Sequence, residues 1–443
     1  MLDALPVDTV QRLAGVIQEV GSPGVALTVT SHGRTAFHGW GWASLPFSVP
    51  VTAQTFFNLG PASRHVTALC VLRLAEDGLV DRGQSIGHYL PDLPPAWADA
   101  PIQSLLTHTS GLPDYLDILP DPFHPPRRDA FQRITSPPPP RFSAGEAWAP
   151  SNTDDLLLGW LVETVAKQPF AAFLANRIFP QAYVPTGQTD AGEQIIERRA
   201  EPYERSRDSL GPTYIHAPLS YGGAPYAGTG GILFDADDIA RWDGGWKQGR
   251  IAAVDLAPML APTPLATGRS IPYGLGWHLG QTRGRVYHLR AGSIPGYSAA
   301  TLRLPADDIA VTVCANVGGA DAALRRMAWV VAELSAPGGT PLTLAPIAAD
   351  PVDKRLAAIL DMSEAPRLDT KIFAPEMMAG LSDPTARRDV LPAFKPPVTL
   401  TPIEEYSVQQ GRMRRYRAVA PNGMDSLLAG FDKDDRLYWL QPH

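Results

Sequence analysis

The stretch LLTHTSGLPD at residues 105–114 decides the expected fold, because further short strings follow it in a fixed order. These strings are FSAG (142–145), the pair Ser151-Asn152, GGIL (230–233), YGLGW (273–277) and GSIPGY (292–297). The six segments are spread over most of the chain before residue 335. Six strings in a fixed order over such a length indicate a particular type of architecture, whereas a single string could occur by chance.

The chain around these strings has the periodicities of a mixed α/β domain. Apolar residues at helical spacing predict helices over 7–20, 63–77, 152–167 and 322–334. Runs rich in β-forming residues predict a hairpin over 25–43 and two closing strands over 301–304 and 308–313. The proline-rich segment 91–140 is expected to form a long irregular excursion over one face.

The ordered strings resemble those of the class C β-lactamase, D-aminopeptidase and family VIII esterase group, within the penicillin-binding-protein-like superfamily of serine hydrolases. The resemblance covers residues from about 10 to 335. It implies an α/β fold of the α+β type, in which helices flank an antiparallel sheet. An all-helical lobe would form the far wall of a cleft.

The remainder of the chain predicts a second, smaller module. We expect a serine β-lactamase-like domain at 1–336, a linker of small and turn-forming residues at 337–350, and a C-terminal α+β domain at 351–443. Within that last domain, short helical patterns precede a predicted meander of about four strands over 398–442. A nuclear-transport-factor-2-like cone is the first interpretation, and a lipocalin-like half barrel is the alternative.

Composition excludes several classes of function. The 443 residues carry a net charge of -7 without long single-sign runs, so neither a nucleic-acid partner nor a membrane partner is expected. No run approaches about 18 apolar residues, and the first residues lack a leader pattern, which favours a cytoplasmic location. Cys70 and Cys314 lie in apolar runs and are expected to be buried free thiols. Metal and nucleotide motifs are absent, so no cofactor is expected.

The first reactive motif of the resembled group is altered in this chain. In that group, S-x-x-K opens a core helix, where the serine attacks a carbonyl and the lysine one turn later takes its proton. Here Gly60-Pro61-Ala62-Ser63-Arg64 holds the place, and the alignment puts Pro61 on the nucleophile and Arg64 on the lysine. Because proline has no nucleophilic atom and a guanidinium cannot act as a base near neutral pH, we expect acylation chemistry to be lost.

The second and third motifs are altered as well. The Y-x-N motif is represented by Pro150-Ser151-Asn152, which keeps the asparagine and lacks the phenol. The K-T-G or H-x-G motif is represented by Arg290-Ala291-Gly292. A shifted register would place Ser63 at the nucleophile, but the residue three positions later is then Val66, so the base is still missing.

Two arginines remain as candidate ligand-binding groups. The resemblance implies that Arg64 and Arg290 converge on one cleft beside Asn152, near Ser293. Planar guanidinium groups favour a carboxylate or phosphate ligand. In the alternative interpretation, the two arginines pair with neighbouring carboxylates and fill an inactive site, the candidate partners being Asp154, Asp155 and Glu146.

Three histidines are candidate acids or bases. His65 follows Arg64 by one helical step, which turns it by about 100° and favours burial or surface exposure over chemistry. His108 lies in the framework string, where the resemblance implies a structural role. His288 lies two residues before Arg290 and faces the same side of a strand, so it is the best remaining general-base candidate.

We therefore expect a non-acylating pseudo-hydrolase, or a repurposed enzyme, that binds a small anionic ligand or a peptide in the ancestral cleft. The candidate catalytic residues are Arg64, Asn152, Arg290, His288 and Ser63. The candidate ligand-binding residues are Arg64, Ser151, Asn152, Arg290, Gly292 and Ser293. One alternative is an active esterase, D-aminopeptidase or peptidase that uses Ser63 or Ser151 as its nucleophile. Another is a structural or interaction protein that forms a homo-oligomer through its C-terminal domain.

Overall fold

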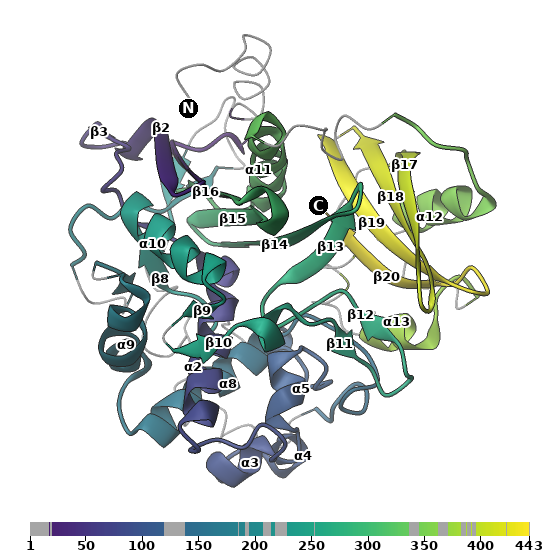
Figure 1. Ribbon diagram of the computed structural model, residues 1–443, viewed down its shortest axis with the longest axis horizontal. Coiled ribbons are helices and arrows are strands. Elements are labelled where there is room, and N and C mark those ends of the chain that lie inside the picture. Colours follow the sequence, from purple (N-terminus) through teal and green to yellow (C-terminus); the bar gives the residue numbers. More distant parts are fainter. Residues whose placement is uncertain are drawn as a thin grey trace.

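A seven-stranded antiparallel sheet forms the centre of the computed structural model (Figure 1). Its strands are, in spatial order, β13 (His278–Thr282), β14 (Arg285–Ile294), β15 (Tyr297–Leu304), β16 (Ile309–Ala315), β1 (Gly24–Ser31), β2 (Arg34–Ser44) and β3 (Val49–Pro50). The structure describes residues 17, 20–118, 138–184, 186–190, 195–206, 214–217, 228–251, 253–335, 345–361, 371–381, 387, 391, 396–421 and 423–442.

Strand β1 shows why the sheet separates two layers. Val25, Leu27 and Val29 belong to a core cluster that includes apolar residues of α11 (Asp321–Ser335). The intervening Thr28 and Thr30 line a small cavity together with residues of α10 (Ala236–Lys247). Because successive side chains of a strand point to opposite faces, helix α11 covers one face of the sheet and α10 lies on the other.

The second layer is a helical lobe built around α2 (Arg64–Glu76) and α8 (Asn152–Ala166), which pack against each other. Helix α2 follows a 3₁₀ turn, Gly60–Ser63. Helix α8 begins after Ser151, whose Oγ accepts a hydrogen bond from the amide of Asp154 at 3.1 Å, a standard N-cap contact. The shorter helices of the lobe are α3 (Ile86–Tyr89), α4 (Pro95–Ala98), α5 (Ile102–Leu106), α6 (Tyr115–Ile118) and α9 (Phe170–Phe173).

Short strands and 3₁₀ or π-helical turns connect these layers. One small sheet contains β4 (Phe57–Asn58), β8 (Ile232–Phe234) and β5 (Gln188–Thr189). The paired strands are β6 (Tyr203–Arg205) with β7 (Tyr214–His216), β9 (Arg250–Ile251) with β10 (Val254–Asp255), and β11 (Thr263–Pro264) with β12 (Ser270–Ile271). The remaining turns are Leu174–Ile178, Pro180–Ala182, Ala257–Leu260 and Pro305–Asp307.

A second antiparallel sheet lies beside the β13 edge of the first (Figure 1). Its four strands follow the sequence order β17 (Thr399–Val408), β18 (Gly411–Ala420), β19 (Gly423–Asp432) and β20 (Leu437–Pro442). Helices α12 (Pro351–Asp361) and α13 (Pro375–Gly380) share a core cluster with it. The meander agrees with the sequence prediction, whereas the cone or half-barrel type and the domain boundaries stay predictions.

The expected serine β-lactamase-like architecture is confirmed, and most element positions agree within a residue or two. The hairpin, the closing strands and the helices predicted at 63–77, 152–167 and 322–334 are all present. Most of the helix predicted over 7–20, residues 119–137 of the proline-rich segment and residues 337–344 of the predicted linker lie outside the described residues. Within the described part of the chain, no helix is long and apolar enough to cross a membrane, and the cytoplasmic location stays a prediction.

Candidate functional site

The turn that leads into α2 lies directly against strand β14. Pro61 is at the start of this turn, where its fixed φ suits a helical beginning and its missing N–H leaves no unsatisfied donor. A methyl group built on Gly292 would lie 2.6 Å from Cβ of Pro61. Glycine at position 292 therefore permits the proline ring to touch the strand backbone, and the first and third altered motifs lie side by side.

Arg64, at the first turn of α2, reaches across to the start of α8. Its Nε forms an ion pair with Oδ2 of Asp155 at 2.8 Å, and its Nη2 donates a hydrogen bond to Oδ1 of Asn152 at 2.7 Å. The amide side chain of Asn152 donates in turn to Oδ2 of Asp114 at 3.0 Å. The alternative pairing of Arg64 with Asp155, weighed from the sequence, is thus observed.

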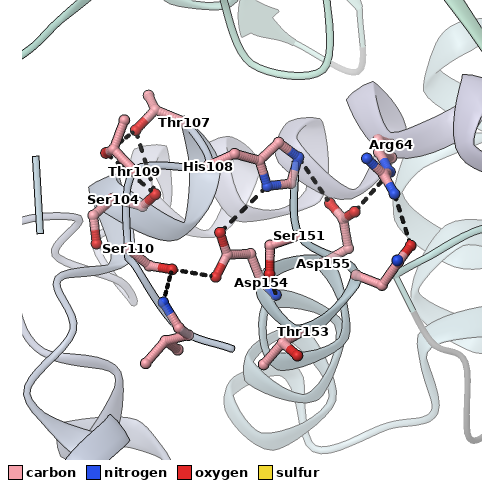
Figure 2. Close-up of polar contacts among 12 residues, drawn as sticks. Arg64, Ser104, Thr107, His108, Thr109, Ser110, Ser151, Thr153, Asp154 and Asp155 are labelled. Atoms are coloured by element: carbon pink, nitrogen blue, oxygen red, sulfur yellow. Dashed lines mark hydrogen bonds and ion pairs between the residues drawn. The ribbon is translucent and has the colours of Figure 1, made fainter. Parts of the chain in front are cut away.

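Behind Arg64 lies a buried chain of polar side chains (Figure 2). His108 lies between two carboxylates, with Nδ1 3.3 Å from Asp154 and Nε2 3.9 Å from Asp155. Ser110 donates a hydrogen bond to the other oxygen of Asp154 at 2.6 Å. Because all four side chains are buried, the chain is a closed network that ends at half-buried Arg64.

Burial shifts the protonation of this network. Desolvation raises the pKa of Asp155 to about 7, even though the charge of Arg64 opposes the shift. Desolvation also raises the pKa of Asp154 well above its ordinary value and lowers that of His108 well below its own. A protonated Asp154 can donate to Nδ1 of a neutral His108, whose Nε2 then carries the hydrogen that faces Asp155.

Arg290 lies in different surroundings from Arg64. Its guanidinium carbon is 4.3 Å from the centre of the Trp277 ring, and the residue is only 6% exposed. The resemblance implied that both arginines converge on one cleft, but Arg290 lines a small enclosed cavity beside α10. Strand alternation correctly placed Arg290 on the same strand face as His288. The burial of the Arg290 side chain follows from its stacking on Trp277.

The remaining histidine candidates are buried as well. His288 lies on the same strand face as Arg290, and its ring is 6.1 Å from that of Trp277. Burial lowers the pKa of His288 to about 4. His65 is fully buried, and its Nε2 accepts a hydrogen bond from Nε1 of Trp242 at 2.9 Å. The burial weighed for His65 is observed, and a base role for His288 stays a prediction.

The candidate serines form contacts within the fold. Oγ of Ser63 is buried and donates to the carbonyl of Gly60 at 2.7 Å, whereas buried Ser151 caps α8. Ser293 is half-buried on β14, where it donates to Asp321 at 3.1 Å. The structure thus groups Arg64, Asn152 and the Pro61–Gly292 contact around the start of α2, and leaves Arg290 and His288 in a separate buried region.

The roles of the acidic groups in this site are not predictable from the sequence pattern. Asp114 ends the string that decides the fold, yet no role was assigned to it, and it holds both the backbone and the side chain of Asn152. Asp154 and Asp155 were considered only as possible partners of arginine. Adjacent acidic residues at a helix start are usually solvated, so only their burial reveals the network. In the described part of the chain, no cluster of metal-binding side chains is present.

Comparisons with known proteins agree with this architecture. The model of the Beta-lactamase family matches residues 10–336. Penicillin-binding protein 4* of Bacillus subtilis (strain 168) is 26% identical over 287 residues, covering 60% of this chain and 62% of that protein. D-aminopeptidase of Gluconobacter oxydans (strain 621H) is 25% identical over 309 residues, covering 66% and 56%. A solved penicillin binding protein from Bacillus halodurans has a TM-score of 0.60 at 21% identity, covering 71% of this chain and 98% of that one.

The sheet, the helical lobe and the ordered strings define a serine β-lactamase/transpeptidase-like protein. The chain belongs to the Beta-lactamase family, whose model matches well over half of its length. It spans 62% and 56% of the lengths of the two curated relatives described above. Both relatives are named for enzyme or penicillin-binding activities, and whether such an activity exists in this chain is a separate question.

Proposed function

We propose that this chain is a β-lactamase-family protein that does not form an acyl-enzyme and instead binds a small anionic ligand or a peptide without covalent chemistry. The observation that carries the proposal is the position of Pro61, whose ring packs against Gly292 at the entrance to α2. The resemblance aligns this position with the nucleophilic serine. Proline offers neither a hydroxyl to attack a carbonyl nor an N–H to stabilise an oxyanion.

The contacts of Arg64 support the absence of a general base. The lysine that the resemblance aligns with Arg64 must lose its proton to act, whereas a guanidinium keeps its proton throughout the accessible pH range. The ion pair with Asp155 stabilises the charged form further. The position therefore supplies a fixed positive charge and hydrogen-bond donors, which suit binding rather than proton abstraction.

The contacts of the two alternative serines argue against the hydrolase hypothesis. Ser63 uses its hydroxyl proton in a bond to the carbonyl of Gly60, and Ser151 accepts from the amide of Asp154. Both side chains are buried. A nucleophilic serine needs an adjacent base that takes its proton, and neither contact provides one.

The half-buried residues around the start of α2 favour an anionic ligand. They are Pro61, Arg64, Asn152, Gly292 and Ser293. Because the pKa of Asp155 is raised to about 7, its carboxylate is partly protonated near neutral pH, and its ion pair with Arg64 is then weakened. An incoming carboxylate or phosphate can supply the negative charge that a protonated Asp155 lacks. Arg64 is the expected ligand-binding arginine, because Arg290 is buried.

Intact-protein mass spectrometry with a fluorophosphonate and a penicillin probe tests the loss of acylation. We expect no adduct on the wild-type chain, and a slow penicillin adduct at position 61 in the double variant P61S/R64K, which restores the motif in the same frame. The single variant R64K is the matched control and should stay unlabelled. A wild-type adduct that maps to Ser63 or Ser151 would overturn the proposal.

Calorimetric titration of the wild-type protein with inorganic phosphate and with N-acetylglycine tests whether the ligand is an anion. We expect at least one of the two anions to bind, with affinity reduced about tenfold or more in R64Q, since a direct charged hydrogen bond contributes roughly 1.5–3 kcal/mol. The control R34Q removes an exposed arginine on β2 and should leave binding unchanged. Failure of both anions to bind, or equal affinity in R64Q, would exclude an anion site at Arg64.

A further inference from the structure

A small, largely enclosed cavity lies between the central sheet and α10. Its volume is about 20 Å³. Threonines of three strands line it on the sheet side, and the lining also includes Trp242 and Trp246 of α10 and Trp277 from the loop before β13. The polar residues that matter for its chemistry are Arg290, Arg303, Asp243, Thr301 and Thr312, together with Trp246 and Trp277.

The lining of this cavity contains several N–H donors without acceptors. Within the described part of the chain, Nε and Nη1 of Arg290 are buried and have no hydrogen-bond partner. The same holds for the indole nitrogens of Trp246 and Trp277. Leaving such donors unpaired costs roughly 1–3 kcal/mol each, and more where the group is charged. Donors that gather around one enclosed space point to an acceptor in that space.

The acceptors of the same lining are already engaged. Asp243 accepts hydrogen bonds from Arg303 and from Thr30, and it forms an ion pair with Lys247 at 3.5 Å. The hydroxyls of Thr301 and Thr312 share a hydrogen bond of 2.9 Å. Only one of those two hydroxyls donates within the pair, so the other retains a hydrogen to offer.

The charges do not balance among the residues that line the cavity. Arg290 and Arg303 contribute two positive charges, and Asp243 contributes one negative charge. Burial and the charge of Arg303 lower the pKa of Arg290 well below its ordinary value, although the charge of Asp243 opposes the shift. A guanidinium nevertheless stays protonated, so one unit of positive charge needs a counter-ion.

We propose that this cavity binds one chloride ion, or another monovalent anion of similar size, as a structural ligand. A space of about 20 Å³ accommodates a single water-sized or halide-sized particle and excludes phosphate, sulfate and carboxylates. A water molecule would accept from two donors, yet it would leave the excess charge uncompensated. A chloride ion accepts from the guanidinium, the indoles and a threonine hydroxyl at once, and it neutralises the site.

This anion site involves Arg290 and not Arg64, and it does not rest on the proposed function. It involves the buried side of β14 and of neighbouring strands, under α10. Its expected effect is on stability, because an anion bound only by the folded state shifts unfolding in proportion to the logarithm of its concentration.

Diffraction at long wavelength tests occupancy directly. Crystals of the wild-type protein are grown in sodium chloride and, in parallel, in sodium bromide, and anomalous difference maps are calculated for both. We expect an anomalous peak next to the guanidinium of Arg290 in at least one of the two. Density for water without anomalous signal in both crystals would overturn the proposal.

Thermal unfolding tests the same site in solution. The wild-type melting temperature is measured while chloride replaces gluconate at constant ionic strength, and we expect it to rise with the logarithm of the chloride concentration. In R290M, which replaces the cation by an apolar chain of similar length, the rise should be absent. The control R34Q removes an exposed charge from the same sheet, and its melting temperature should still rise with chloride. An equal chloride response in R290M, or no response in the wild type, would contradict a chloride site at Arg290.

Discussion

Asp155 lies between a cation and a buried histidine, and its protonation changes the charge beside Arg64. Its carboxylate is 2.8 Å from Nε of Arg64 on one side and 3.9 Å from Nε2 of His108 on the other. Three aspartates, Asp114, Asp154 and Asp155, lie within reach of one another's charges, and Arg64 is the cation that influences all three. With one cation among three buried carboxyl groups, the network is stable only when part of it is protonated.

The pH dependence of stability should report this protonation. The pKa of Asp155 is raised to about 7 from 3.8, so the folded protein holds a proton that the unfolded chain releases within this window. The contribution of Asp155 to the free energy of unfolding is therefore complete below 3.8 and is lost as the pH rises through about 7. D155N keeps an acceptor for Arg64 and cannot titrate.

We subtract the free energy of unfolding of D155N from that of the wild type at each pH. We expect this difference to fall by several kcal/mol between pH 3.8 and about 7, at roughly 1.4 kcal/mol per pH unit. The difference between the two proteins is the useful quantity, because buried His108 titrates with the opposite sign in both. Urea unfolding followed by circular dichroism at a series of pH values measures it. A difference that does not change with pH would show that Asp155 has an ordinary pKa.

At the scale of single residues, the sequence predicted the ion-pair partners of side chains better than how deeply the side chains are buried. It named Asp155, together with Asp154 and Glu146, as a candidate partner of the two arginines, and the structure pairs Arg64 with Asp155. It did not predict that Arg290 lies over Trp277, since strand alternation determines the face of a side chain and not its surroundings. The positions of Trp246 and Trp277, which lie on a helix and in a loop far apart in the sequence, follow only from the assembled fold.

At the scale of elements, the contact between the Gly60–Ser63 turn and β14 holds the helical lobe against the sheet. Gly292 has no left-handed φ, so its small size and not its backbone freedom explains its use. G292A would place a methyl group 2.6 Å from Cβ of Pro61. We expect it to lower the free energy of unfolding by about 1–3 kcal/mol, the usual cost of overpacking.

Two further variants separate this steric effect from a general effect of alanine. P61G/G292A removes the opposing ring and should recover part of the loss. G244A lies within α10 and has open space around its added methyl group, so it should be neutral or slightly stabilising. Chemical unfolding of the four proteins makes the comparison. A G292A protein as stable as the wild type would show that the ring of Pro61 does not pack against the strand at Gly292.

Most elements were predictable because local signals mark their ends. Ser151 caps α8, and the turn at Ser31, His32 and Gly33 closes the first hairpin with positive φ at His32 and Gly33. The association of the C-terminal meander with the first domain was not predictable. It depends on pairs such as Arg415 with Gln281, which are 134 positions apart and have no sequence signature.

At the scale of the whole molecule, buried polar and aromatic contacts connect the C-terminal sheet to the β13 edge. Arg415 on β18 is fully buried, and it donates to the carbonyl of Gln281 and to the hydroxyl of Tyr287, both at 3.0 Å. The ring centres of Trp439 and Trp148 are 4.9 Å apart. Trp148 in turn contacts Tyr273, which contacts His108 of the buried network, through the rings. The C-terminal sheet is thus connected through these rings to the buried network behind Arg64.

This arrangement predicts that both sheets unfold together. R415M leaves Glu404 without the cation that pairs with it at 3.2 Å, and breaking such a buried pair costs about 3–5 kcal/mol. We expect a large fall in the melting temperature with a single calorimetric transition, since the contacts join the sheets into one cooperative unit. R436M removes a partly exposed arginine from the β19–β20 turn and should cost less than about 1 kcal/mol. A second, earlier transition in the wild type would show instead that the C-terminal sheet is an independent unit, so that Arg415 stabilises a docking contact and not the fold as a whole.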